Sequence, residues 1–463
     1  MSTRRTGSAR GPSGDLRGDV IGFRVDVYTD EYLPDGVTDA DALLTVCAED
    51  DGAPGEPDVE HVEHVEHVEH VEHVEVIVID CSGSMSTPAT KIYAARRAAC
   101  AAVDGLRPGT LFAVIRGTGT AQVVYPPGGG LARAATDTRD QARRTINRMS
   151  AAGGTAIGSW LLTARDLFAG HPDAVRHAIL LTDGRNEHES AADFADALAA
   201  CRGHFQCDSR GVGRGWVAAE LTAVSDTLLG TARDIADPAD LVADFQAMTK
   251  AAMARALPAV SLRVWIPHGA RISTFKQVHP TLEDLLERGT AVGGQETEFP
   301  TGAWGAGCRD YHLSVSGLLP HRITRPSRLA RIAVVTDRRR LAGGDVQAMW
   351  TADEQLHTQV SREVRHSRGV IDLAEAIRLG MAARGRGDLA AAGAHLGRAL
   401  DLARASHDQA TAEILEQVVE ADPAGDAPAG DAPWVRPDVD PHLFEVLEVR
   451  YRFTRALEPR RAR

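Results

Sequence analysis

Val76-Ile-Val-Ile-Asp80-Cys-Ser82-Gly-Ser84 is the stretch that decides the fold, because four consecutive Val and Ile residues run directly into an acid and two hydroxyls. Such a run cannot alternate apolar with polar side chains. Both faces of the strand must therefore be covered, as in a parallel sheet between two layers of helices. Ligand sites in these sheets lie just beyond the carboxyl ends of the strands. We expect a buried central strand that brings oxygen atoms to one point.

Apolar strands alternate with helical patterns from this stretch to Leu257. The segment His177–Thr182 repeats the opening pattern and ends in Asp183-Gly184, and a tight loop at Ala152–Thr155 enters a helix. Strands that alternate with helices are typical of an α/β fold. The sequence therefore predicts a doubly wound, mostly parallel sheet over residues 76–257.

Five polar residues are expected to meet at the carboxyl edge of this sheet, namely Asp80, Ser82, Ser84, Thr155 and Asp183. Two carboxylates and three hydroxyls are hard oxygen donors with only two negative charges. This set suits Mg²⁺, with Mn²⁺ or Ca²⁺ as alternatives, although Ca²⁺ usually takes more carboxylates. The Asp-x-Ser-x-Ser segment alone could instead cap the following helix. The separate Thr155 and Asp183 segments favour the metal site.

The three segments Asp80-Cys-Ser82-Gly-Ser84, Gly153-Gly154-Thr155 and Thr182-Asp183-Gly184 resemble the complete metal-ion-dependent adhesion site of a von Willebrand factor A-type domain, over about residues 75–257. The resemblance implies that the Ser and Thr hydroxyls coordinate Mg²⁺ directly or nearly so, and that the Asp residues bind it directly or through water. It also implies that a carboxylate of a partner protein completes the coordination. The flanks more loosely resemble bacterial, actinomycete-like proteins in which this domain lies inside a β-domain.

Alternating apolar residues flank the α/β unit on both sides. The segments Phe23–Val27 and Leu44–Ala48 precede it, and segments beginning at Val260, Tyr311, Ile332 and Val346 follow it. Because two N-terminal strands need sheet partners of their own, we expect a β-sandwich built from both flanks, with Phe23–Val27 pairing with a strand after Val260. The α/β unit would then be inserted into the β-sandwich.

The C-terminal part reads as a small α-helical segment. The run Arg384–Ala392 resembles the inter-helix turn of a tetratricopeptide hairpin, a unit too small to be stable without docking on a neighbour or a partner. Val449, Tyr451 and Phe453 alternate with arginines, which predicts an edge strand with a basic face; a solvated face explains the arginines better than a nucleic-acid site does. The expected parts are a disordered head (1–19), N-terminal strands (20–57), a repeat linker (58–75), the α/β domain (76–257), a β-sandwich (258–366), a helical hairpin (367–421), and a linker with a basic tail (422–463).

Two further segments carry possible soft metal ligands. His-Val-Glu is repeated five times from His61 to Glu75, and its period of three fits neither a strand nor a helix. We interpret it as a low-complexity linker; the alternative is a Zn or Ni site formed by its imidazoles. Cys201-x-x-His204-x-x-Cys207 could be part of a zinc site, but it lacks an evident fourth ligand, so buried structural thiols are the preferred interpretation.

Composition excludes several classes of function. A net charge of −13 argues against general affinity for nucleic acid or an anionic membrane. No apolar run is long enough for a signal peptide core or a transmembrane helix. The six cysteines are irregularly spaced, and we expect all of them to be reduced in a cytoplasmic protein.

These features favour a Mg²⁺-dependent protein-interaction module that binds an Asp or Glu of its partner. One alternative is a metal-dependent hydrolase acting on phosphate esters, but no nucleophile-and-base signature accompanies the site, so enzymatic activity is not expected. Another is a regulatory subunit of a separate AAA+ ATPase, which would be external because the chain has no Gly-x-x-x-x-Gly-Lys motif.

Overall fold

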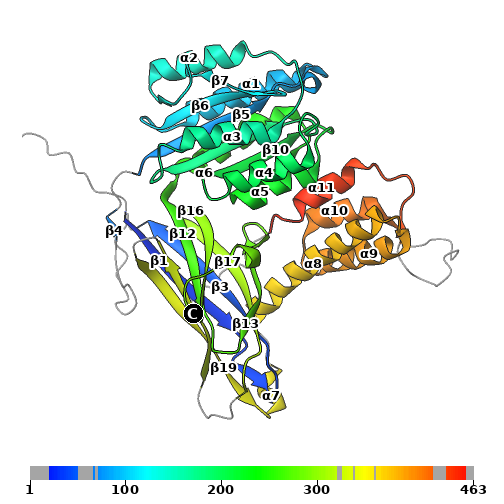
Figure 1. The fold of residues 1–463 in the computed structure, drawn as a ribbon. Helices are drawn as coiled ribbons and strands as arrows, with labels where there is room; N and C mark the ends of the chain where they lie inside the picture. The colour runs from blue at the N-terminus through cyan, green and yellow to red at the C-terminus, as the bar shows by residue number, and fades with distance from the viewer. Residues whose placement is uncertain are drawn as a thin grey trace, which may run out of the picture.

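The computed structural model describes residues 20–50, 66–67, 71–320, 326–336, 339–358, 361–420 and 434–454. The expected disordered head and most of the His-Val-Glu repeat lie outside these residues. Figure 1 shows an α/β unit, a β-sandwich below it, and C-terminal helices at the side of both. In the described part of the chain, no helix has the length and apolar composition needed to cross a bilayer.

The α/β unit is built on a seven-stranded sheet in the order β11-β10-β9-β5-β6-β7, with β8 also pairing with β6. At its centre β5 (His73–Asp80) pairs in parallel with β6 (Leu111–Gly117) and β9 (Val175–Thr182), and every residue of β5 is buried. The predicted buried central strand and the mostly parallel sheet are therefore confirmed. The other strands are β7 (Ala121–Tyr125), β8 (Ala132–Arg133), β10 (Gln206–Val212) and β11 (Ala232–Ile235).

Alternate side chains of β5 enter two separate apolar clusters, which explains its unbroken Val/Ile run. Ile77 and Ile79 pack with α1, α2 and α6 on one face, whereas Val76 and Val78 pack with α3, α4 and α5 on the other. The bounds of these helices are α1 Thr90–Gly105, α2 Thr136–Asn147, α3 Ile157–Phe168, α4 Ala191–Cys201, α5 Ala218–Leu228 and α6 Leu241–Met253.

The β-sandwich draws strands from both sides of the α/β unit. In one sheet, β3 (Ala40–Asp50) pairs with β17 (Gly307–Ser316) in antiparallel register, so the two flanks share a sheet. The expected pairing of Phe23–Val27 with a strand after Val260 is wrong. Among the described strands, β1 (Val20–Thr29) pairs with β3 and β4 (Glu66–His67), because β3 lies between β1 and β17.

The two sheets have the orders β14-β13-β17-β3-β1-β4 and β15-β16-β12-β18-β19-β2. Their inner faces form one apolar cluster that includes Leu44, Leu262, Phe275, Phe299 and Ile332. The sequence did not reveal β13 or β16. The remaining strands are β2 (Tyr32–Pro34), β12 (Arg255–Trp265), β13 (Arg271–His279), β14 (Glu283–Asp284), β15 (Thr290–Ala291), β16 (Glu296–Gly305), β18 (Ser327–Val335) and β19 (Arg340–Thr351).

A disulfide joins Cys47 on β3 to Cys308 on β17. The two residues are direct partners in the antiparallel ladder, which brings their side chains together on one face. The expectation that all six cysteines are reduced is therefore wrong for this pair. Because disulfides are rare in reducing compartments, the bond does not support the cytoplasmic expectation. The other four cysteines are free.

Polar residues are buried where the α/β unit meets the β-sandwich. His177 Nδ1 lies 2.9 Å from Glu75 Oε1, and its Nε2 lies 2.9 Å from Asp208 Oδ2. Burial disfavours charged His177, but the two carboxylates outweigh it and raise the His177 pKa. The last repeat triplet also belongs to this junction: His73 Nε2 lies 2.8 Å from the carbonyl oxygen of Arg255 at the start of β12. Residues 73–75 are thus part of β5 rather than of a linker.

The C-terminal segment contains more helix than predicted. The expected hairpin is extended to three helices, α8 (Arg362–Gly385), α9 (Leu389–Ala405) and α10 (Gln409–Val418), after a short α7 (Glu354–His357). The predicted C-terminal edge strand is wrong, because His442–Arg450 forms α11. Just after α11, Phe453 forms an isolated bridge with Thr281. β20 (Val419–Glu420) and β21 (Trp434–Val435) pair between α10 and α11.

Helix α11 docks on the α/β unit (Figure 1). Arg450 makes two contacts to Asp234, at 3.0 and 3.1 Å, and Arg452 lies 2.6 Å from Asp226. A Glu445 carboxylate oxygen accepts a hydrogen bond from the Ala218 N–H at the start of α5, at 2.7 Å. Arg450 and Arg452 are thus paired with acids of the chain itself rather than forming the solvated strand face that the sequence predicted.

Candidate metal centre

Asp80 lies at the carboxyl end of β5 with no exposed surface. Its Oδ1 accepts a hydrogen bond from the Ser82 N–H at 2.7 Å, and its Oδ2 accepts one from the Thr182 hydroxyl at 2.6 Å. Burial raises the pKa of Asp80, and the hydrogen bonds from Ser82 and Thr182 oppose that rise. The strand thus delivers a carboxylate whose orientation is fixed by its own loop and by the neighbouring strand.

Ser82, Ser84 and Asp183 are connected by hydrogen bonds across two loops. The Ser82 and Ser84 hydroxyl oxygens lie 2.9 Å apart, and the Ser84 hydroxyl donates to Asp183 Oδ1 at 2.7 Å. Asp183 directly follows β9 and, like Asp80, has no exposed surface. The two predicted carboxylates therefore come from adjacent strands and meet through a pair of hydroxyls, as expected from parallel strands that end at one edge.

Thr155 approaches the same place from the loop before α3. A Cβ atom added to Gly184 would lie 3.2 Å from the Ser84 hydroxyl oxygen and 3.8 Å from that of Thr155. Both oxygens therefore face the Gly184 backbone. The Gly83 N–H donates to the Gly153 carbonyl at 2.9 Å, which holds the two loops together. All five predicted residues are thus found at one edge of the sheet.

Residues after Asp183 hold the Thr155 loop, a role that the sequence did not reveal. His188 Nδ1 accepts a hydrogen bond from the Thr155 N–H at 3.2 Å, and the His188 N–H donates to the Thr155 carbonyl at 2.9 Å. The imidazole lies against Gly154, where a Cβ atom would be 2.1 Å from the ring. Asn186 accepts from the Ile157 N–H at 2.9 Å, at the start of α3. These contacts position the Thr155 loop, although His188 is itself exposed.

Lys91 is the other residue that sequence reasoning missed. It lies in the first turn of α1, and its Nζ is 2.6 Å from Asp183 Oδ2. Its side chain is 14% exposed, whereas that of Asp183 is fully buried. The lysine stem passes Gly213, whose added Cβ would be 3.2 Å from Lys91 Cε. Both Asp183 oxygens are therefore engaged, one by a hydroxyl and one by an ammonium group.

The donor set fits a hard divalent cation. Two buried carboxylates and nearby hydroxyls supply oxygen atoms only, which are the ligands that Mg²⁺ takes. Across the described ranges, no three His, Cys, Asp or Glu side chains gather in a way that could hold a metal. The possible zinc site at Cys201, His204 and Cys207 is therefore not assembled. In the repeat, His61, His64 and His70 lie outside the described residues, and the His73 ring contacts backbone carbonyls.

Three comparisons relate the chain to known proteins. A family model described as the von Willebrand factor type A domain matches residues 75–234. The structure "von Willebrand factor type A from Catenulispora acidiphila" is 38% identical in sequence and has a TM-score of 0.85. The match covers 96% of this chain and 99% of the chain in that structure. The ArnB paralog VWA2 from Sulfolobus acidocaldarius is 12% identical and has a TM-score of 0.53. The match covers 93% of this chain and 96% of the VWA2 chain, and the similarity is one of fold alone. The comparison with curated proteins gave no match.

Proposed function

Because the chain belongs to the von Willebrand factor type A domain family, we propose that it is a Mg²⁺-dependent protein-interaction module that binds a carboxylate of its partner. The observation that carries this proposal is the meeting of two fully buried carboxylates, Asp80 and Asp183, with hydroxyls from separate loops. Buried carboxylates are costly unless a cation or a hydrogen-bond network compensates them. A divalent cation would compensate both.

Asp80, Ser82, Ser84, Thr155 and Asp183 are the residues that would hold the ion, as a complete metal-ion-dependent adhesion site. The bound ion would supply an electrophilic centre that attracts a partner's Asp or Glu, because the hydroxyl ligands are neutral and leave much of its charge uncompensated. Thr182 and His188 would keep the ligands oriented, since their hydrogen bonds fix Asp80 and the Thr155 loop.

Hydrolysis is a weaker alternative on the same geometry. A general base must lie within hydrogen-bond reach of the reacting group and be available to take a proton. Of the described residues that contact the predicted ligands, Lys91 and His188 are candidates, but Lys91 is paired with Asp183 and His188 with the Thr155 backbone. An external AAA+ ATPase stays a proposal for the partner, without a specific surface that favours it.

The test compares partner capture by the wild type and an Asp80→Asn variant, each with Mg²⁺ and with EDTA. We expect EDTA and Asp80→Asn to remove the same partner proteins from material purified from the native cell. Asp208→Asn is the matched control, because Asp208 is also a buried carboxylate but lies at the other end of the sheet. Capture that survives both EDTA and Asp80→Asn, in folded protein, would contradict the proposal.

A further inference from the structure

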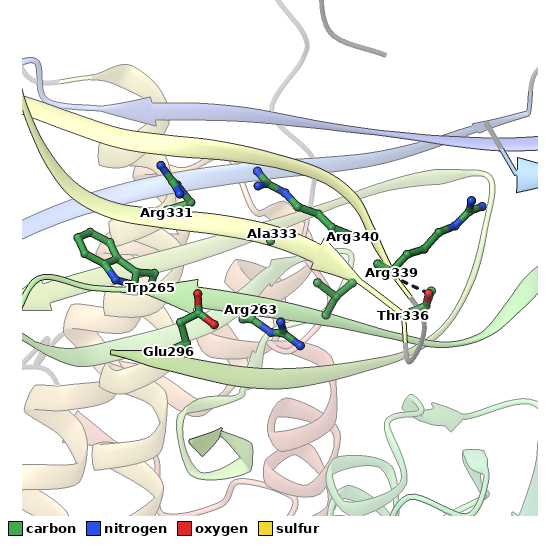
Figure 2. A pocket seen from close by; sticks show the side chains of 9 residues that line it. Arg263, Trp265, Glu296, Arg331, Ala333, Thr336, Arg339 and Arg340 are labelled. Carbon is green, nitrogen blue, oxygen red and sulfur yellow. Dashed lines mark hydrogen bonds between the residues drawn. The ribbon is translucent and has the colours of Figure 1, made fainter. Parts of the chain in front are cut away.

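A pocket of about 310 Å³ lies on the β-sandwich, and none of its lining residues belongs to the α/β unit (Figure 2). It opens on the outer face of the sheet that contains β16, β12, β18 and β19. The inner face of that sheet carries Leu262, Val264, Ile332 and Val334, which pack in the sandwich core. Side chains alternate along a strand, so the residues between these four point outward.

Strand register explains why the outer face is hollow at Ala333. Arg263 on β12 is the direct partner of Ala333 on β18, and Ala333 is the direct partner of Gly343 on β19. A methyl group and a bare backbone therefore lie next to a long arginine. Arg331, two residues from Ala333 on the same strand, projects from the same face and lines the pocket too.

Gly343 allows a third guanidinium group to lie on the floor of this pocket. A Cβ atom on Gly343 would be 2.1 Å from Arg340 Nη2, so the Arg340 side chain folds back over the glycine. Figure 2 shows Ala333 with Arg263, Arg331 and Arg340 around it. Three guanidinium groups from three strands thus surround one alanine.

The positive charges at this pocket are only partly compensated, although the Glu296 carboxylate also lines it. Arg263 lies 2.8 Å from Glu298, and Arg331 lies 3.1 Å from Asp345. In the part of the chain that the structure describes, the Arg340 guanidinium hydrogen-bonds only to the carbonyl of Ala342, at 3.4 Å. Because the whole chain carries a net charge of −13, this positive site is a local feature and not a consequence of overall composition.

We propose that this pocket binds the phosphate group of a small phosphate monoester, seated over Ala333. Guanidinium groups donate paired hydrogen bonds that match phosphate and carboxylate oxygens. Three of them offer more donors than the two oxygens of one carboxylate can use, whereas a phosphate monoester has three terminal oxygens. The pocket is also larger than a phosphate group needs, and Trp265 on its wall offers an apolar surface for the organic part of the ester.

The test is calorimetric titration of the full chain with inorganic phosphate, ribose 5-phosphate and succinate. We expect ribose 5-phosphate to bind more tightly than inorganic phosphate, and both to bind more tightly than succinate. Ala333→Leu fills the floor without changing charge, and Arg340→Gln removes the guanidinium over Gly343. Each substitution should weaken binding of ribose 5-phosphate at least tenfold.

Arg328→Gln is the matched control. Arg328 lies on the same strand and pairs with Asp345 at 2.8 Å, but it does not line the pocket. It should change binding less than twofold. An equal loss in Arg328→Gln and Arg340→Gln would indicate unspecific attraction and overturn the site, as would the absence of saturable binding by both phosphates. Tighter binding of succinate would overturn the assignment to phosphate monoesters. Thermal unfolding of each variant verifies that it is folded.

Discussion

The ammonium nitrogen of Lys91 lies 2.6 Å from Asp183 Oδ2, so the chain itself supplies a cation to one of the two carboxylates at the candidate metal centre. Replacing Lys91 with Met leaves a buried carboxylate without its ion pair. Without metal, we expect the free energy of unfolding to fall by about 2 kcal/mol. Since Lys91 would compete with a divalent ion for Asp183 under the proposed function, we also expect Mn²⁺ to bind at least tenfold more tightly to the variant. Denaturation in EDTA and calorimetric Mn²⁺ titration measure the two effects.

Lys250→Met is the control for Lys91→Met, because Lys250 is an exposed lysine on α6 and the change in net charge is the same. If Lys91→Met perturbs folding too strongly, Lys91→Gln keeps a neutral donor toward Asp183. An unchanged Mn²⁺ affinity in both Lys91 variants would mean that the lysine does not compete with the metal.

His188→Ala should weaken Mn²⁺ binding about tenfold while the protein stays folded. The His188 imidazole accepts a hydrogen bond from the Thr155 N–H at 3.2 Å and packs on Gly154. Removing the imidazole therefore frees the loop that carries the Thr155 hydroxyl. Outer groups that orient ligands typically affect metal affinity to this extent. Calorimetric titration measures the affinity, and exposed His204→Ala provides the comparison. Equal affinities in the two variants would refute a positioning role for His188.

The buried Glu75, His177 and Asp208 cluster predicts a stability that depends on pH. The His177 pKa is raised from its ordinary value of 6.5. Protonated His177 therefore stabilises the folded protein fully below pH 6.5, and this stabilisation is lost as the pH rises through the pKa of the folded state. Burial opposes charged Asp208, but the hydrogen bond and charge of His177 lower its pKa from 3.8. Ionised Asp208 therefore stabilises the folded protein fully above pH 3.8, and this stabilisation is lost as the pH falls below 3.8.

Asp208→Asn should consequently lower the free energy of unfolding most between pH 3.8 and pH 6.5, the ordinary pKa values of Asp and His. We expect the loss in this window to be about 3 kcal/mol. The difference from the wild type should shrink on either side of that window. Urea denaturation of both proteins from about pH 2.5 to about pH 9 measures the difference on both sides of the window. A difference that stays constant over this range would show that the cluster is not charged as we infer.

Arg450→Met should lower the free energy of unfolding by about 1 to 2 kcal/mol, because Asp234 is 4% exposed and would lose its ion pair. Arg214→Met is the control: it breaks the Arg214–Asp440 pair, which also joins the C-terminal segment to the α/β unit but is exposed. That change should cost less than about 0.5 kcal/mol. Chemical denaturation measures both, and equal losses would contradict the importance of burial.

The sequence was most informative where one local pattern determines the structure. The Val76–Ile79 run has no polar face, and it predicted a central strand whose alternate residues enter two clusters. The five predicted ligands also lie directly after strands or in Gly-rich loops, so their meeting follows from parallel topology. Lys91 and His188 could not be predicted in this way, because their contacts to Asp183 and Thr155 depend on how α1 and a loop pack.

Misleading local patterns explain the wrong predictions. Tyr451 and Phe453 alternate with arginines, but Phe444 and Leu447 recur at helical spacing and are buried, so α11 forms instead of a strand. In β13, register shifts after Ile272 and Gln277 interrupt the two-residue period by which strands are recognised. The Cys47–Cys308 bond depends on a register between strands far apart in the chain, which irregular cysteine spacing does not reveal.

The pairing of β3 with β17 also determines the order in which the protein can be completed during synthesis. Cys47 and Cys308 are 261 residues apart in sequence, and the whole α/β unit lies between them. A ribosome adds roughly 5 to 20 residues per second, so β1 and β3 must wait many seconds for the strand that covers their open edge. The α/β unit, whose contacts are complete earlier, can fold in that interval and bring the two flanks together. Until then, the edge of β3 is exposed to other nascent chains.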